Sequence, residues 1–264
     1  MKTHMNRHGM ILLTLLIGAM TVSIGSAAEE GSGTYFVWSD MASVKPELME
    51  TYMKTRIADA KLCAENKFEF PFLTFVDGFN VHMAGLFRTF SQLDGFPQKM
   101  AAWNTKTGGK AEQLEQQSSQ CVSHHNSWIS VYRPDLSYEP ENPAFTPDFS
   151  KPFHQIAVIY SIKPGKYETA QEVGKKIKAA HERGKSPLGY RVYEHICGEG
   201  VPAFAVVMTT KDKAQFVMLD AKMKANPNDE VRQIMTENAD VLTGVETKEA
   251  EYVPEASYVP EGTL

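Results

Sequence analysis

Two adjacent histidines lie near the middle of the chain. Their side chains can do chemistry for which residues 241–248, the segment 120 residues further along, have no counterpart. His124 and His125 lie in residues 121–128, which end in Trp128. Imidazole can ligate a metal or a haem iron, or carry a proton near neutral pH. The aligned segment, residues 241–248, has no histidine, cysteine or tryptophan. We therefore treat the first segment as a candidate site, with an exposed polar turn before a strand as the alternative.

Two further histidines lie at the ends of predicted strands. His82 begins one strand, and His195 ends another, with Glu194 and Cys197 beside it. Such positions can line a pocket between sheets, although a histidine bonded only to backbone or water is the alternative. Frequent aromatic residues along the strands favour a flat, mostly apolar ligand if the sheets enclose a pocket, and a packed core if they do not. The candidate ligand-binding residues are His82, His124, His125, Trp128 and His195.

Several motifs that would specify a reaction are absent from the sequence. It has no Gly-rich phosphate loop, no G-x-S-x-G elbow, no H-E-x-x-H and no paired C-x-x-C. Cys63, Cys121 and Cys197 have spacings that match no zinc site, and we expect all three to be small buried side chains. No catalytic residue and no metal ligand is predicted.

A repeated decapeptide indicates an internal duplication. Residues 132–141 read YRPDLSYEPE and residues 252–261 read YVPEASYVPE, with six identical positions and Asp135 matched by Glu255. The offset is 120 residues. A second match near the start of each half has an offset of 118 residues, since residues 44–46 and 162–164 both end in Lys-Pro. Two matches in the same order at nearly one offset predict that one fold unit occurs twice.

Both halves also have the same predicted order of elements. A long helix follows each first strand, and a second helical stretch, residues 91–104 or 211–225, precedes each last strand. The expected strands are residues 35–38, 72–76, 81–87 and 128–132 in the first half, and residues 156–160, 190–196, 203–208 and 249–253 in the second. This β-α-β-β-α-β order is the ferredoxin-like arrangement, whose sheet carries helices on one face only. A second copy can bury the other face.

The sequence therefore predicts an α+β fold of two tandem ferredoxin-like units, residues 34–138 and 154–258, packed sheet to sheet as an intramolecular barrel. Between them, residues 139–153 form an expected stiff, extended connector. This expectation depends on the prolines in and just before the connector, because five lie within 19 residues: Pro134, Pro140, Pro143, Pro147 and Pro152.

This tandem order resembles the dimeric α+β barrel superfamily, fused into one chain. That class includes NIPSNAP-like proteins, antibiotic-biosynthesis-type monooxygenases and haem-binding chlorite dismutases. The resemblance covers most of residues 34–259 and depends on element order rather than on a catalytic motif. It implies two facing sheets that enclose either a pocket or a packed core.

The first 28 residues have the three parts of a secretory signal. Lys2 and Arg7 precede an uncharged apolar run over residues 10–25, and small residues up to Ala28 precede Glu29. We expect cleavage after Ala28 and a periplasmic or secreted protein of 236 residues, whose formal net charge changes from −5 to −7. That acidic balance disfavours nucleic acid and anionic membranes as partners. Because the sequence has no second long apolar run, we expect no membrane segment after cleavage. Assembly into a homo-oligomer is compatible with the sequence.

These observations leave three classes of function open. The first is a protein that binds a small, mostly apolar organic ligand between its two sheets, without a cofactor. The second is an enzyme of the same fold, either a cofactor-independent oxygenase or a haem protein that uses His125 or His195. The third is an envelope protein that serves only protein contacts.

Overall fold

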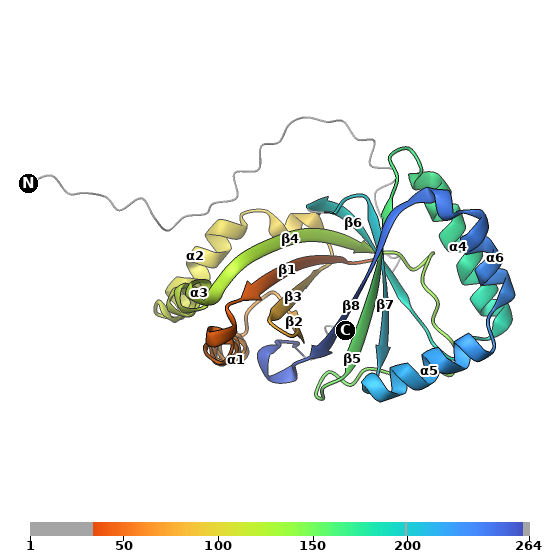
Figure 1. The fold of residues 1–264 in the computed structure, drawn as a ribbon. Coiled ribbons are helices and arrows are strands. Elements are labelled where there is room, and N and C mark those ends of the chain that lie inside the picture. Colours follow the sequence, from red (N-terminus) through yellow and green to blue (C-terminus); the bar gives the residue numbers. More distant parts are fainter. Residues whose placement is uncertain (1–33, 199, 261–264) are drawn as a thin grey trace, which may run out of the picture. The chain divides into compact units, whose positions relative to one another are not determined.

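The computed structural model describes residues 34–198 and 200–260, and this part of the chain contains eight β-strands and six α-helices (Figure 1). The expected signal segment, residues 1–28, lies outside the described residues. The strands are β1 Phe36–Val44, β2 Phe72–Asp77, β3 Asn80–Phe87, β4 Val122–Tyr132, β5 His154–Ile162, β6 Arg191–Gly198, β7 Ala203–Thr210 and β8 Leu242–Tyr252. The helices are α1 Met49–Asn66, α2 Phe96–Lys106, α3 Lys110–Cys121, α4 Tyr167–Gly184, α5 Lys213–Ala225 and α6 Asp229–Glu237.

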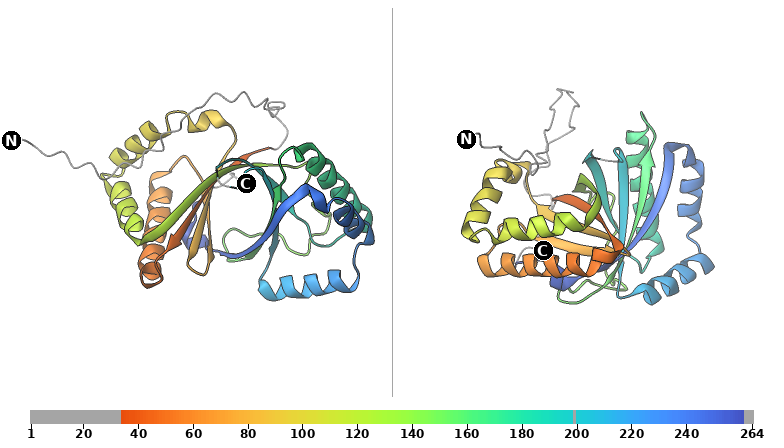
Figure 2. Two further views of the ribbon diagram at one scale, coloured as in Figure 1. Left: turned by 45° about the horizontal axis from the view of Figure 1, so that its top comes forward. Right: turned by 60° about the vertical axis from the view of Figure 1, so that its left-hand side comes forward.

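The strands close into one barrel in the order β1-β3-β2-β8-β5-β7-β6-β4, and every neighbouring pair is antiparallel. Strands β1–β4 make one four-stranded sheet, and β5–β8 make the other. The two sheets join along both edges, through β2 with β8 and through β4 with β6. The expected α+β barrel is therefore confirmed. Helices α1–α3 lie outside the first sheet and α4–α6 outside the second (Figure 2).

The second helical stretch of each half differs from expectation, because each is two helices. Residues 91–104 were expected as one helix, but α2 begins at Phe96 and α3 follows after Gly108 and Gly109. Both glycines have positive φ, 63° and 82°, a conformation that reverses the chain at no steric cost to glycine. In the described part of the chain, no helix is both long enough and apolar enough to cross a bilayer.

The repeated decapeptides cross from one half to the other. Tyr138, in the first decapeptide, exchanges two backbone hydrogen bonds with Tyr190 of the second half, at 2.9 and 2.8 Å. Tyr258, in the second decapeptide, exchanges the same pair with Phe72 of the first half, at 2.9 and 2.8 Å. Each segment, called an arm below (residues 133–138 and 253–258), thus completes the other half.

The arms also contribute to the opposite hydrophobic cores. Leu136 and Tyr138 belong to the cluster that contains Phe204 of the second half. Tyr258 belongs to the cluster that contains Phe72 and Trp103 of the first half. Burial of these side chains explains why the decapeptide is similar in both halves, since both copies meet the same packing requirement. The origin of the halves by duplication stays a prediction.

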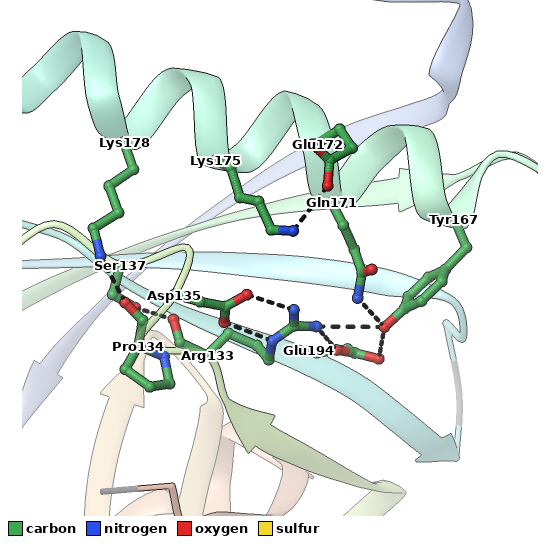
Figure 3. Close-up of polar contacts among 10 residues, drawn as sticks. All are labelled: Arg133, Pro134, Asp135, Ser137, Tyr167, Gln171, Glu172, Lys175, Lys178 and Glu194. Carbon is green, nitrogen blue, oxygen red and sulfur yellow. Dashed lines mark hydrogen bonds and ion pairs between the residues drawn. The ribbon is translucent and has the colours of Figure 1, made fainter. Parts of the chain in front are cut away.

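A polar network fastens the first arm to helix α4 (Figure 3). The Arg133 guanidinium donates to Asp135 at 2.9 and 2.8 Å and forms an ion pair with Glu194 on β6. Tyr167, at the start of α4, donates to the same Glu194 carboxylate. From further along α4, Lys178 Nζ donates to the Pro134 carbonyl at 3.0 Å. The second arm has Val253 where the first has Arg133, so this network belongs to one half only.

The predicted connector, residues 139–153, contains neither helix nor strand. It is not a free linker, however. Phe145 and Phe149 pack on Phe153 in the cluster at this end of the barrel. Ala144 also donates its backbone N–H to Pro187 at 3.0 Å. The connector therefore lies against both halves rather than projecting into solvent.

Candidate functional site

The barrel encloses a cavity of about 470 Å³. All eight strands contribute to its wall, because alternate side chains of a strand point to the same face. Much of the wall is apolar, with side chains such as Val37, Leu73, Phe75, Ile159 and Val207. The volume is within the range of pockets that bind small organic molecules.

Three of the sequence-predicted residues meet in this cavity. The indole of Trp128 on β4 lies between two imidazoles, that of His82 on β3 and that of His195 on β6. Its ring centroid is 5.4 Å from that of His82, with the planes 18° apart, and 5.7 Å from that of His195, at 35°. Two small buried residues flank this stack, since Ser39 pairs with Trp128 and Ser130 with His195. The serines leave room for the three rings on one wall.

Each imidazole has one buried nitrogen without a hydrogen-bond partner in the described part of the chain. These atoms are Nε2 of His82 and Nδ1 of His195. Burial lowers the pKa of His82 to about 4; Asp40 opposes this shift, whereas Lys248 and His195 add to it. Burial, together with the charge of Lys248, also lowers the pKa of His195 to about 4. Both rings are therefore neutral near pH 7, and each has a buried nitrogen whose hydrogen-bonding capacity is unused within the described residues.

The other two predicted residues lie elsewhere. The expected polar turn before the last strand is wrong, because β4 already begins at Val122 and includes His124 and His125. Both side chains are exposed, and neither belongs to the cavity wall. His125 Nε2 lies 2.7 Å from the Asp40 carboxylate, which also accepts a 2.7 Å hydrogen bond from Ser127.

Sequence reasoning missed the charged side of the cavity. Lys248 and Glu246 on β8 line the wall, and their charged groups are 3.4 Å apart. Lys248 stands in the second half where Trp128 stands in the first, 120 residues earlier. That alignment was the available signal, because a charged residue at an inward-facing strand position is unusual in a packed core.

The expectation for the cysteines is correct at two positions of three. Cys63 and Cys121 are buried free thiols, but Cys197 near the end of β6 is exposed. Burial raises the pKa of the Cys63 thiol, which is therefore unreactive near neutral pH. Among the described residues, no cluster of three or more His, Cys, Asp or Glu side chains is arranged to hold a metal ion.

The groups at the cavity do not fit a haem. His125, one of the two ligands considered, is bound to Asp40 outside the cavity. His195 faces the cavity, but Trp128 lies against its ring. Lys248 is the one Lys or Arg among the described residues of the wall, so it can pair with only one of the two propionates of haem.

Comparison with known proteins gives a fold and no family. No family model and no curated protein sequence matches the chain. Among solved structures, an anthrone oxidase-like protein is 10% identical, with a TM-score of 0.54 over 86% of this chain and 92% of its own. A "putative monooxygenase" from Lactobacillus acidophilus is 8% identical, with a TM-score of 0.52 over 86% and 100%. Chlorite dismutase from Candidatus Nitrospira defluvii, in complex with imidazole, is 12% identical, with a TM-score of 0.50 over 85% and 93%.

These neighbours have the α+β barrel that the present chain forms. At such low identity the likeness shows the fold alone. The closer resemblance to NIPSNAP-like proteins, and the fusion of two ancestral units, stay predictions.

Proposed function

We propose that this protein is exported and that its barrel binds a small, flat, mostly apolar organic ligand. One observation carries the proposal: two neutral imidazoles, each with a nitrogen that has no partner among the described residues, flank Trp128 at a cavity of about 470 Å³. Buried polar atoms in native proteins are nearly always hydrogen-bonded. A hydroxyl group of a bound molecule that reaches these nitrogens can donate or accept a hydrogen bond and would satisfy them.

The shape of the wall favours a planar ligand. The rings of His82, Trp128 and His195 lie against one another, and Phe75 stacks against His82, at 6.0 Å and 30°. Because these contacts use the ring faces, a planar aromatic ligand would meet the ring edges, in the edge-to-face contact that aromatic pairs also favour. The apolar side chains opposite the rings would cover the remaining ligand surface.

A cofactor-independent oxygenase is the second candidate, and the oxidase-like and monooxygenase neighbours favour it. Such a reaction needs a base that removes a proton from the substrate. General bases work best when their pKa is near the operating pH. The pKa of about 4 makes His82 and His195 weak bases, and this favours binding over catalysis.

The first test is native mass spectrometry of the protein purified from its host, followed by titration with the recovered molecule. We expect a retained organic compound of small mass. His195→Phe keeps an aromatic ring at this position but removes the two ring nitrogens. It should weaken binding about tenfold, which is the effect of losing one buried hydrogen bond. His125→Ala, outside the cavity, is the matched control and should bind normally.

Other outcomes would favour the other candidates. Consumption of dioxygen when the recovered molecule is added would establish the oxygenase. If no compound is retained and none of a set of planar aromatic compounds binds, the binding proposal is wrong, and a protein-contact role becomes the better explanation. Equal binding by His195→Phe and the wild type would remove His195 from the site.

A further inference from the structure

The cavity has one feature that an apolar ligand does not explain, the ammonium group of Lys248. It comes from β8, where Lys248 pairs with Ala157 of β5, and it is the only Lys or Arg among the lining residues described. Trp128 holds the corresponding place in the first half. The two halves therefore present an aromatic ring and a cation at matching positions of the same cavity.

Within the protein, the ammonium group of Lys248 forms only a weak ion pair. Glu246 Oε1 is 3.4 Å from Lys248 Nζ, and the two side chains are 62% and 36% exposed. Exposed ion pairs at such distances contribute little free energy, so Glu246 can turn to solvent at small cost. The other carboxylates of the wall do not hold the lysine: Glu249 bonds Lys213 at 2.6 Å, and Asp77 is exposed at the end of β2. The ammonium is thus available to a ligand.

The charge of Lys248 also affects the two imidazoles. Its positive charge contributes to the lowered pKa of both His82 and His195, so the ammonium is close enough to influence each ring. A neutral imidazole carries one N–H donor, and an ammonium has three. An anionic oxygen is the acceptor that all of these donors favour, since a bond to a charged partner is about twice as strong as a neutral one.

We propose that the ligand is an aromatic carboxylate, with its ring system against the edges of the His82, Trp128 and His195 rings and its carboxylate at Lys248. The inference rests on the proposed function, because it specifies the chemistry of the molecule that the cavity would bind. A neutral hydrocarbon would leave the ammonium paired only with Glu246, and a cationic group placed beside Lys248 would face like charge.

The test compares two probes of nearly equal shape, 2-naphthoate and naphthalene-2-carboxamide, by isothermal titration calorimetry at pH 7. We expect the wild type to bind the carboxylate at least tenfold more tightly than the amide, the effect of one charge-assisted hydrogen bond. Lys248→Met should abolish this preference and leave amide binding unchanged. Lys248→Arg should retain it, and Glu246→Gln should increase it. Lys175→Met, on the solvent side of α4, is the matched control and should behave as the wild type.

The outcomes separate the two proposals. If the amide binds as tightly as the carboxylate, or if Lys248→Met keeps the preference, the inference is overturned while ligand binding stands. If neither probe binds the wild type, ligand binding of this class is overturned together with the inference. A thermal unfolding curve for each variant shows that a loss of preference is not a loss of fold.

Discussion

The imidazole of His82 is stacked on the indole of Trp128, with ring centroids 5.4 Å apart and planes within 18° of parallel. His195 on β6 lies against the same indole, so rings from β3, β4 and β6 form one stack. Trp128 is thus the central ring of this stack. A molecule bound against these rings would change the surroundings of the indole.

Trp128 should therefore report ligand binding by fluorescence. The other two tryptophans lie outside the barrel, where Trp38 packs on Phe96 and Trp103 packs on Phe68. Trp128→Phe should remove the ligand-dependent change in emission and weaken binding severalfold, because a smaller ring loses part of the stacking contact. Trp38→Phe is the control and should keep the change. A change that persists in Trp128→Phe would place the ligand elsewhere.

Stability should fall as the pH falls from about 6.5 to about 4. His82 and His195 have a pKa near 4 in the folded protein, compared with 6.5 when exposed. The unfolded chain therefore binds more protons in this window, and acid favours it. Each group contributes a slope of up to about 1.4 kcal/mol per pH unit. Urea unfolding at pH 7.5, 5.5 and 4.5 measures the slope.

His195→Phe provides the comparison that isolates one group. It should flatten the pH dependence between pH 6.5 and 4, because the titrating ring is gone, whereas Ser119→Ala, which replaces an exposed side chain that does not titrate, should leave the dependence unchanged. An identical slope in His195→Phe and the wild type would contradict the assignment of the lowered pKa.

The element order and part of the site could be predicted from the sequence. Most of the strands have a short run of apolar and β-branched residues, and the repeat identifies β8, which has none, from its match to β4. His82, Trp128 and His195 were recognisable because they break the similarity between the halves. His124 and His125 break it as well, yet they lie outside the cavity. A sequence difference between the two halves shows where residues have diverged. It does not show whether their side chains face the cavity or the outside of the barrel.

The missed features have physical causes. Helix α3 is almost wholly polar, and Ala111, Leu114 and Cys121 pack on the core. Tertiary contacts of a few side chains stabilise such a helix, and its sequence shows no apolar stripe. Lys248 was missed because Lys in a strand is usually exposed, and only the closed barrel turns this one inward.

The two arms should contribute separable amounts of stability. Ser137 Oγ accepts a 2.8 Å hydrogen bond from the Val192 backbone N–H, and Ser257 Oγ accepts one of 2.8 Å from Thr74. Replacing either serine by alanine leaves a buried N–H without a partner and should cost about 1–3 kcal/mol. Chemical denaturation of each variant measures this.

The double variant of Ser137 and Ser257 should lose the sum of the two single effects, since the serines lie in different arms and share no partner. Ser119→Ala, on the exposed side of α3, is the control and should change stability by less than about 0.5 kcal/mol. A loss in only one single variant would show that the arms are not equivalent.

The network around Arg133 should matter more than a surface ion pair. Arg133 and Glu194 are 18% and 13% exposed, and Tyr167 also donates to the Glu194 carboxylate. Glu194→Gln should therefore destabilise the protein by about 1–3 kcal/mol. Glu172→Gln breaks the exposed pair with Lys175 on α4 and should cost less than about 1 kcal/mol. Equal effects in thermal unfolding would contradict this ranking.

Export predicts a particular N-terminus. Amino-terminal sequencing of the protein recovered from its native host should begin at or near Glu29, because small residues at Ser26 and Ala28 suit signal peptidase. The protein should be found outside the cytoplasm. Recovery of a cytoplasmic protein that retains Met1 would show that the segment is not removed.

Because each arm packs on the other half, the order in which the chain is synthesised affects how the first half folds. Tyr258 follows all eight strands in the sequence, yet it packs beside Phe72 and Trp103 in the core of the first half. On a ribosome, that core lacks this side chain until the second arm has been synthesised, and β2 lacks its β8 neighbour. The first half therefore reaches its native packing only after the second half has been synthesised.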